Sequence, residues 1–378
     1  MIVGNQLLNV RGIRLRVRVS CVAAWLVSLT AVLAQTPVVT EYLIPGGRAK
    51  FPSEIVAGPD GNLWFTESLA PSGLQVGKIG RITTLGVITE FSTPTPNNTI
   101  AAITSGPDGN LWFAELTACA FLTCPANIGK ITTSGIVTEF AVNGDPTAIT
   151  SGPNGNLWFT ESEANKIAKI TTGGLITEFP LPTANSFPSG IARGPDGNLW
   201  FVGNPHKIGR ISTSGVVTEF AIPSAFDAAS ITAGPDGNMW FLMPFDDKIG
   251  RISTSGAITV FSVPPGFARE IASGPDGALW FTISDQLGRI TTSGVVSEFR
   301  LPSPFPADRS TIGITLGPDG NMWFTEGFAG MIGKLTIAAP VPPVPTPLPS
   351  SVLLVGTGLL VLMSWSLWRF RLRVRRTV

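Results

Sequence analysis

The chain has 378 residues, of which 13% are charged, and Gly (42) and Pro (32) together account for about one residue in five. This composition is typical of a turn-rich all-β protein and argues against a largely helical or disordered chain. One histidine and three cysteines exclude two-histidine zinc sites, four-cysteine clusters and paired-imidazole iron sites. Nine of the 26 basic residues lie in the two ends and leave the middle acidic, which argues against nucleic acid as a partner.

Residues 1–34 are predicted to be a signal peptide. A basic segment up to Arg18 precedes an apolar stretch at 19–33, and small residues up to Ala34 suit cleavage before Gln35. An uncleaved membrane anchor is the alternative, but the apolar stretch is shorter than the ~20 residues that a span needs. We therefore expect an exported protein that resides in the cell envelope or outside the cell.

Seven copies of one sequence pattern fill residues 35–338. Each copy has a short apolar strand, a GPDGN-like turn, an [LM]WF strand, an [IL]-[GA]-[KR]-[IL] strand and, in most copies, a TEF-like strand. Tryptophans mark the copies at spacings of 48, 46, 42, 40, 40 and 43 residues, namely Trp64, Trp112, Trp158, Trp200, Trp240, Trp280 and Trp323. Four short strands in each period of about 40–45 residues predict an all-β fold, a seven-bladed β-propeller of four-stranded antiparallel blades. We expect this propeller to be a monomer.

The ring has a predicted closure. Only six copies are followed by a TEF-like strand, because the seventh copy, at 312–337, runs into a Pro-rich segment. The segment 38–42 matches the missing pattern, so it is predicted to pair with the last blade and leave no unpaired edge at the seam.

The repeated charges also suggest a pairing. A two-residue turn between the third and fourth strands would place the cation of each KIGRI-like strand opposite the glutamate of TEF. The expected pairs are Arg81–Glu90, Lys130–Glu139, Lys169–Glu178, Arg210–Glu219, Arg289–Glu298 and, across the closure, Lys334–Glu41, whereas Arg251 would face Val260. A basic ring that binds an anionic ligand is the alternative interpretation.

One face of the propeller is the candidate binding face. The loops after the second and fourth strands vary in length and sequence, as binding loops usually do, and both emerge on this face. Glutamates end the second strand in four adjacent blades, and such carboxylates could hold Mg²⁺ or Ca²⁺; they are Glu67, Glu115, Glu161 and Glu326. A solvated acidic rim without metal is the alternative. The expected ligand is a small molecule, a peptide or a glycan.

Two loops on this face carry further candidate residues. Cys119 and Cys124 lie in the long loop of the second copy and are expected to form a local disulfide, because the chain is predicted to be exported. His206 lies in the equivalent loop of the fourth copy. It is either a surface residue or a catalytic base, since its side chain titrates near neutral pH.

The C-terminal part has three features. Residues 339–349 are Pro-rich and predict an extended linker. Residues 350–378 hold an apolar run with a terminal Arg cluster, which predicts a membrane-spanning or sorting segment. This arrangement resembles the PEP-CTERM sorting signals of exported proteins of Gram-negative bacteria, although the sequence PTPLP at 345–349 departs from Pro-Glu-Pro.

The repeated GPDGNLWFTE and KIGRI sequences resemble the streptogramin lyase (virginiamycin B lyase) family of seven-bladed propellers. The resemblance implies a Mg²⁺ ion held by glutamates and a histidine base that opens a cyclic depsipeptide by elimination at its ester. It places that histidine just before the first strand of a blade. The corresponding segments, such as FPSEI at 51–55 and STIGI at 310–314, contain no histidine, and His206 lies in a different loop.

We therefore expect an exported, envelope-associated propeller that serves in binding or scaffolding and lacks the catalytic histidine. The alternative is a Mg²⁺-dependent carbon–oxygen lyase or hydrolase that acts on a cyclic depsipeptide, ester or lactone. In that case His206 would be the base.

Overall fold

The computed structural model describes residues 6–10, 13–17, 38–69, 77–96, 98–117, 126–224, 226–301 and 310–337. The chain divides into two compact units, Met1–Thr36 and Pro37–Val378. In the first unit, β1 (Gln6–Val10) and β2 (Ile13–Val17) form an antiparallel hairpin. These strands lie within the predicted signal peptide, whose cleavage stays a prediction.

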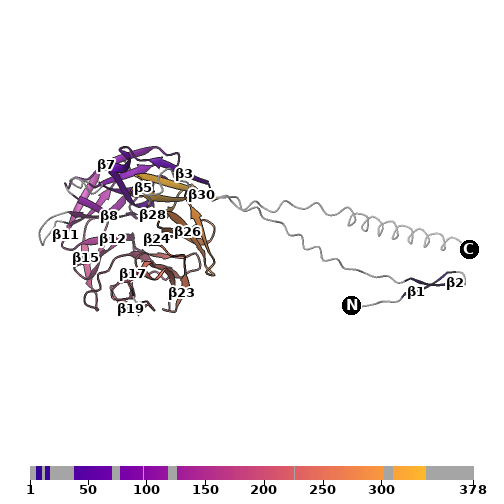
Figure 1. Cartoon of the computed structure of the whole chain (residues 1–378). Helices are drawn as coiled ribbons and strands as arrows, with labels where there is room; N and C mark the ends of the chain where they lie inside the picture. Colours follow the sequence, from indigo (N-terminus) through magenta and orange to yellow (C-terminus); the bar gives the residue numbers. More distant parts are fainter. Residues whose placement is uncertain are drawn as a thin grey trace, which may run out of the picture. The chain divides into compact units, whose positions relative to one another are not determined.

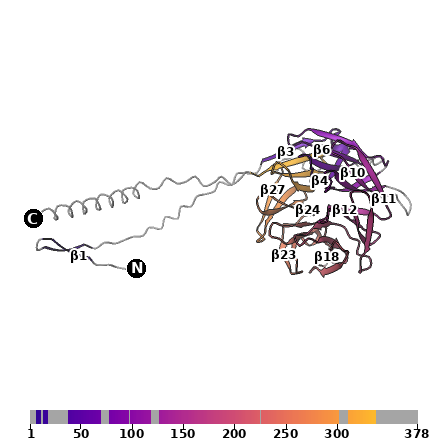
Figure 2. The ribbon, with the colours of Figure 1, turned by 180° about the vertical axis from the view of Figure 1, so that it is seen from behind.

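The second unit contains seven four-stranded antiparallel sheets (Figure 1). Their first strands contact one another in chain order around a common centre, and the last of them, β28, also contacts the first, β4. Figure 2 shows the same ring from behind. The predicted seven-bladed propeller is therefore confirmed.

Each blade contributes four strands, here called A to D from the centre outwards. In chain order they are β4 (Lys50–Ala57), β5 (Leu63–Leu69), β6 (Lys78–Ile82) and β7 (Ile88–Ser92); β8 (Asn98–Ser105), β9 (Leu111–Thr117), β10 (Ala126–Ile131) and β11 (Val137–Val142); β12 (Pro146–Ser151), β13 (Leu157–Glu161), β14 (Lys166–Ile170) and β15 (Ile176–Pro180); β16 (Ile191–Arg193), β17 (Leu199–Gly203), β18 (Lys207–Ile211) and β19 (Val217–Ala221); β20 (Ile231–Ala233), β21 (Met239–Met243), β22 (Lys248–Ile252) and β23 (Ile258–Ser262); β24 (Ala268–Ser273), β25 (Ala278–Ile283), β26 (Gln286–Thr291) and β27 (Val296–Arg300); and β28 (Thr311–Leu316), β29 (Met322–Glu326), β30 (Met331–Thr336) and β3 (Val38–Leu43). The short 3-10 helices η1 (Gly47–Ala49) and η2 (Pro244–Asp246) are the helical elements of the described residues.

The N-terminal strand closes the ring, as predicted. Strand β3 pairs antiparallel with β30 along its whole length. The ring of Tyr42 stacks on Trp323 with centroids 5.7 Å apart, in the place that a phenylalanine takes in the other blades. Lys334 then donates a hydrogen bond to the carbonyl of Thr84 in blade one, 3.3 Å away. The first and last blades are thus joined by pairing and by packing.

The core lies between neighbouring blades. Alternation along strand B sends Trp64 toward blade two, where it packs with Ile100 and Phe113, and sends Leu63 and Phe65 toward blade seven. All seven strand-B tryptophans are at most 1% exposed. Since both faces of each sheet are buried, every strand B is apolar on both sides.

The predicted cation–glutamate pairs are wrong by one residue. The turn after β10 is a three-residue loop, in which the amide of Gly135 donates to the carbonyl of Thr132 (2.9 Å) and Gly135 has φ +94°. This extra residue places Lys130 opposite Thr138, on the other face of the sheet from Glu139. The same shift separates Arg81 from Glu90, Lys169 from Glu178, Arg210 from Glu219, Arg289 from Glu298 and Lys334 from Glu41, and it places Arg251 opposite Thr259 instead of Val260.

The strand-C cations instead contact the aspartate of the A–B turn and the tryptophan of strand B, and this set of three side chains recurs in the blades. In blade five the Trp240 indole donates to Asp236 (2.9 Å), and Arg251 lies 3.6 Å from the same carboxylate and 5.7 Å from the indole centroid. Arg251 also donates to the carbonyl of Thr292 in the next blade (3.1 Å). The equivalent ion pairs are Arg81–Asp60, Lys130–Asp108, Arg210–Asp196, Arg289–Asp276 and Lys334–Asp319. Blade three has Asn154 in place of the aspartate.

The predicted linker and sorting segment, residues 339–378, lie outside the described residues. Within the described ranges, no helix has both the length and the apolar character needed to cross a bilayer.

Candidate functional site

The four nominated glutamates occupy equivalent positions at the end of strand B, and each is at most 2% exposed. Glu67 accepts a hydrogen bond from the Lys50 ammonium at 3.0 Å, and Lys50 also bonds to Glu90. Burial and the neighbouring Glu90 raise the pKa of Glu67 to about 7, against the opposing effect of Lys50. This carboxyl is therefore part of a buried ion-pair network within blade one.

The next two glutamates have different surroundings. Glu115 accepts hydrogen bonds from the side-chain amides of Asn98 and Asn127, the latter at 3.3 Å. Glu161 has no hydrogen-bond partner for either carboxyl oxygen among the described residues. Burial is the main cause that raises the pKa of each of these two glutamates to about 7. The alternative interpretation, a solvated acidic rim, is therefore wrong, because these glutamates are buried in separate blades.

The residues do not fit the magnesium ion that the resemblance implies. No group of three or more His, Cys, Asp or Glu side chains in the described ranges could hold a metal ion. Oε2 of Glu67 and both oxygens of Glu115 accept hydrogen bonds from donors of their own blades. A shared metal site for the four glutamates is therefore not supported by their geometry.

His206 ends the turn between strands B and C of blade four, with φ +51°. Its amide donates to the carboxylate of Asp227 at 2.8 Å, and its Nδ1 lies 3.3 Å from the same oxygen. The imidazole is 40% exposed. The structure thus gives His206 an aspartate partner on the predicted binding face, separate from the nominated glutamates. Cys119 and Cys124 lie outside the described residues, so their disulfide stays a prediction.

A channel along the propeller axis is the feature that the sequence analysis missed. It has a volume of about 640 Å³ and is lined by the A strands of the blades. One lining position recurs directly before the strand-A residue that pairs with the strand-B phenylalanine. In chain order it holds Glu54, Ala102, Ala148, Gly190, Ser230 and Glu270 in blades one to six, and in blades one, two, three and six it lies at a bulge. Small residues at most of these positions leave the channel open.

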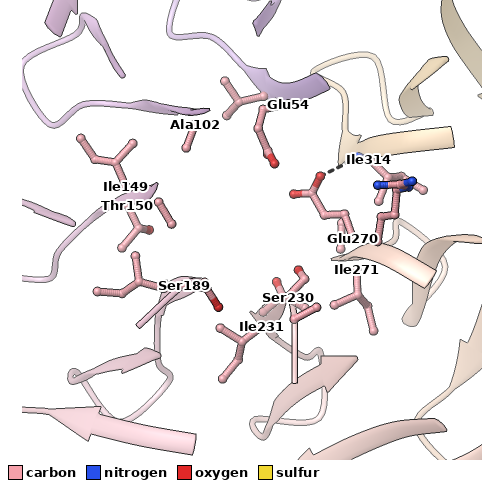
Figure 3. A pocket seen from close by; sticks show the side chains of 18 of the residues that line it. Glu54, Ala102, Ile149, Thr150, Ser189, Ser230, Ile231, Glu270, Ile271 and Ile314 are labelled. Carbon is pink, nitrogen blue, oxygen red and sulfur yellow. Dashed lines mark hydrogen bonds between the residues drawn. The ribbon is translucent and has the colours of Figure 1, made fainter. Parts of the chain in front are cut away.

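Glu54 and Glu270 face each other in this channel (Figure 3). Glu270 accepts a hydrogen bond from the amide of Ile314 at 3.2 Å, and the carboxyl groups of Glu54 and Glu270 are close enough for each to affect the pKa of the other. Burial raises the pKa of Glu54 to about 7, and burial together with the charge of Glu54 raises the pKa of Glu270 well above its ordinary value. Both carboxyls therefore lose their protons at a higher pH than ordinary glutamates do.

The bulge explains both the orientation of this pair and why pattern reasoning missed it. The amide of Glu54 donates to the hydroxyl of Thr66 (3.1 Å), and that of Glu270 donates to Thr282 (3.0 Å). A bulge interrupts the alternation of strand A, so the direction of its side chains cannot be read from a period of two. The sequence offered one signal for this pair: two of the seven copies have a glutamate at a position where the other copies have a small residue.

Exposed aromatic rings lie on the loops of the predicted binding face. Phe226, Phe245 and Phe267 are 47%, 64% and 42% exposed, and Phe245 lies 5.7 Å and 5.3 Å from the other two ring centroids. The guanidinium of Arg269 lies 5.2 Å from the Phe267 centroid, and Arg269 also lines the channel. These three rings, the Phe226 cluster, thus form an apolar surface that continues toward the channel.

Comparison with known proteins places this geometry in a family. The model of the virginiamycin B lyase family matches residues 29–226 and 203–352. A virginiamycin B lyase from Staphylococcus aureus is 35% identical, with a TM-score of 0.70 over 80% of this chain and 100% of that one. The same values hold for its catalytically inactive histidine-to-alanine variant with quinupristin.

A streptogramin B lyase structure is 32% identical over 81% of this chain and 99% of that one, with a TM-score of 0.70. No curated protein matches the chain significantly. Because the family model spans most of the chain and the similar structures are covered almost completely, the chain belongs to the virginiamycin B lyase family.

Proposed function

We propose that this propeller is a binding module of its family, exported and associated with the cell envelope, and that it does not open cyclic depsipeptides. The observation that carries this proposal is the place of the only histidine of the chain, on the B–C turn of blade four beside Asp227. The S. aureus lyase is catalytically inactive when one histidine is replaced by alanine. The segments that lead into the A strands of this chain offer no histidine for that task.

The binding role is supported by the Phe226 cluster and the channel. Exposed apolar area of this kind favours contact with an apolar or aromatic group of a ligand. The channel offers hydroxyl groups, among them those of Thr147 and Ser230, and the carboxyl pair as polar partners. A small molecule, a peptide or a glycan that combines an apolar group with hydrogen-bonding groups suits this combination.

Incubation of the purified propeller with quinupristin and Mg²⁺ tests the proposal, with the S. aureus lyase as the positive control and chromatography of the ring-opened product as the readout. We expect no ring opening. We also expect quinupristin, if it binds at all, to bind less tightly to Phe245→Ala. Ring opening that Glu326→Gln or His206→Ala abolishes would refute the binding-only function.

The second candidate function is a lyase or hydrolase that uses His206. The 3.3 Å distance between Nδ1 and the Asp227 carboxylate favours it, since a carboxylate beside an imidazole stabilises the positive charge that the ring gains when it acts as a base. A screen of cyclic esters and lactones checks this candidate. It requires ring opening that His206→Ala removes.

A further inference from the structure

An apolar residue recurs at one exposed position of the blades, where the chain enters strand D. In six blades it is a branched aliphatic residue that is 61–70% exposed, namely Val38, Val87, Ile136, Leu175, Val216 and Val295. Blade five has the exposed Ala257 at this position. Because equivalent positions of a closed repeat lie around one axis, these side chains form a ring on one face of the propeller, here called the aliphatic ring.

The loop between strands C and D does not require an aliphatic side chain at this position. In blade two the carbonyl of Ile136 accepts from the amide of Thr132 at 2.9 Å, and the amide of Ile136 donates to the Thr132 hydroxyl at 3.0 Å. Ala257 makes the same two backbone bonds with Ser253, at 2.9 Å and 3.0 Å. The recurrence of a large exposed apolar side chain in six blades therefore needs another explanation.

Both ends of the closed ring lie on the face that carries the aliphatic ring. Strand β30 ends at Thr336, which pairs with Val38, the first residue of β3. The chain therefore enters and leaves the propeller at the face of the A–B turns and C–D loops, here called the turn face. The sequence predicts an extended linker at 339–349 and a membrane segment at 350–378 beyond this point. At about 3.1 Å per residue, such a linker reaches about 34 Å, so an anchor there holds the turn face near the bilayer.

The charges of the two faces differ as well. In six blades the aspartate of the A–B turn lies within 4.0 Å of the strand-C cation, so the turn face carries these aspartates in neutral pairs. The loops of the opposite, predicted binding face contain the aspartates Asp145, Asp227, Asp246, Asp247 and Asp285. A bilayer with anionic lipids repels an acidic surface, and it therefore favours contact with the turn face.

The spacing of the aliphatic side chains favours a lipid surface over a protein partner. Protein docking sites are contiguous apolar patches. The aliphatic ring instead has one large apolar residue in each of six blades, and Ser, Thr and Gly residues of loops such as 132–135 lie between them. Separate apolar anchors at one level suit a flat, deformable surface into which each side chain can insert on its own.

We propose that the aliphatic ring is a membrane-contact surface, and that the propeller lies on the bilayer with its turn face toward the lipid. The predicted binding face and the Phe226 cluster then point away from the membrane and stay accessible to a ligand. This inference rests on the envelope association of the proposed function, and it is independent of whether the propeller binds or cleaves its ligand.

Photo-cross-linking of the full chain in vesicles of phosphatidylethanolamine and phosphatidylglycerol tests the orientation. Val216→p-benzoylphenylalanine probes the turn face and Phe245→p-benzoylphenylalanine the binding face, at positions that are 67% and 64% exposed and therefore matched. Lipid adducts are measured by mass spectrometry after flotation of the vesicles. Burial of one aliphatic side chain in lipid is worth roughly a tenfold preference, so we expect at least about ten times more lipid adduct at Val216 than at Phe245.

A second set of variants separates the effect of the aliphatic ring from that of the tether. Ile136→Ser combined with Leu175→Ser removes two members of the ring and should lower the lipid adduct at Val216 by roughly tenfold or more. Thermal unfolding should not change, because both positions are exposed. Phe226→Ser, at an exposed position of the binding face, is the control and should leave the adduct at Val216 as in the wild type.

Three results would overturn the inference while the chain floats with the vesicles: equal lipid adducts at Val216 and Phe245, cross-links from Val216 to a second copy of the chain in place of lipid, or an adduct that the two serines leave unchanged. A chain that does not float with the vesicles would refute this inference and the envelope association together. Ring opening of quinupristin would refute the binding-only function alone.

Discussion

The two ends of the blades differ in how strictly the repeat is kept. At the A–B turns, the same set of aspartate, tryptophan and strand-C cation recurs with small variation in six blades. At the opposite end, Glu67 accepts a hydrogen bond from a lysine, Glu115 accepts from two asparagine amides, and Glu161 has no hydrogen-bond partner within the described ranges. The end with the A–B turns thus stabilises the ring. The end with the strand-B glutamates can vary because the stability of the ring does not depend on it.

The largest effect is expected from a tryptophan of the conserved end. Trp240→Ala should lower the free energy of unfolding by about 3–5 kcal/mol, because it leaves a cavity between blades five and six and removes the stacking on Phe261. Denaturant titration measures this. Phe245→Ala, at a 64% exposed ring of the variable end, is the control and should change stability by less than about 0.5 kcal/mol. Similar losses for both variants would contradict the division between the two ends.

The channel pair should make stability depend on pH in an unusual direction. Since burial raises the pKa of Glu54 in the folded protein to about 7, above the ordinary value of 4.5, its contribution to stability is complete at acid pH and is lost as pH rises through 7. Glu270→Gln removes the carboxyl whose ionisation burial and the charge of Glu54 make costly, and it should stabilise the protein at pH 8 relative to the wild type, by an amount on the order of 2 kcal/mol.

Unfolding curves at pH 5 and pH 8 measure this difference. Glu163→Gln, at an exposed position, should leave the pH dependence unchanged. A Glu270→Gln protein with the same pH dependence as the wild type would show that the ionisation of the channel pair does not affect stability.

The smallest effects concern the aspartate of the A–B turn. Burial alone would raise the pKa of Asp236, but hydrogen bonds from Trp240 and Asn238 hold this pKa below its usual value. Asp236→Asn should therefore cost about 1 kcal/mol at neutral pH. The loss should shrink as pH falls through the pKa of the folded protein, because the protonated wild type no longer gains from the charge.

The reverse change is available in blade three. Trp158 donates to the Asn154 side chain at 3.3 Å, and Lys169 stacks near the same indole. Asn154→Asp should add a charge-assisted hydrogen bond and stabilise the protein by about 0.5 kcal/mol. Thermal unfolding of Asp236→Asn and Asn154→Asp measures both effects. If Asn154→Asp is less stable than the wild type, the set of aspartate, tryptophan and cation cannot be transferred to blade three.

The sequence by itself determined the number of blades, the order of their strands and the closure by the N-terminal strand. These features follow from a repeat whose apolar strands can be buried only by stacking copies on both sides. The tryptophan and the apolar residues of strand B were predictable for the same reason. The segments outside the described residues, including Cys119 and Cys124, keep only their sequence-based predictions.

Only the tertiary structure decided the charge pairing and the channel. The additional loop residue at Gly135 moved Glu139 to the opposite face from Lys130, and an error of one residue changes every cross-strand partner. The bulge in strand A turned Glu54 and Glu270 toward each other, although four blades lie between them in the sequence. Such side-chain directions depend on local departures from regular strand geometry, which the hydrophobic pattern does not record.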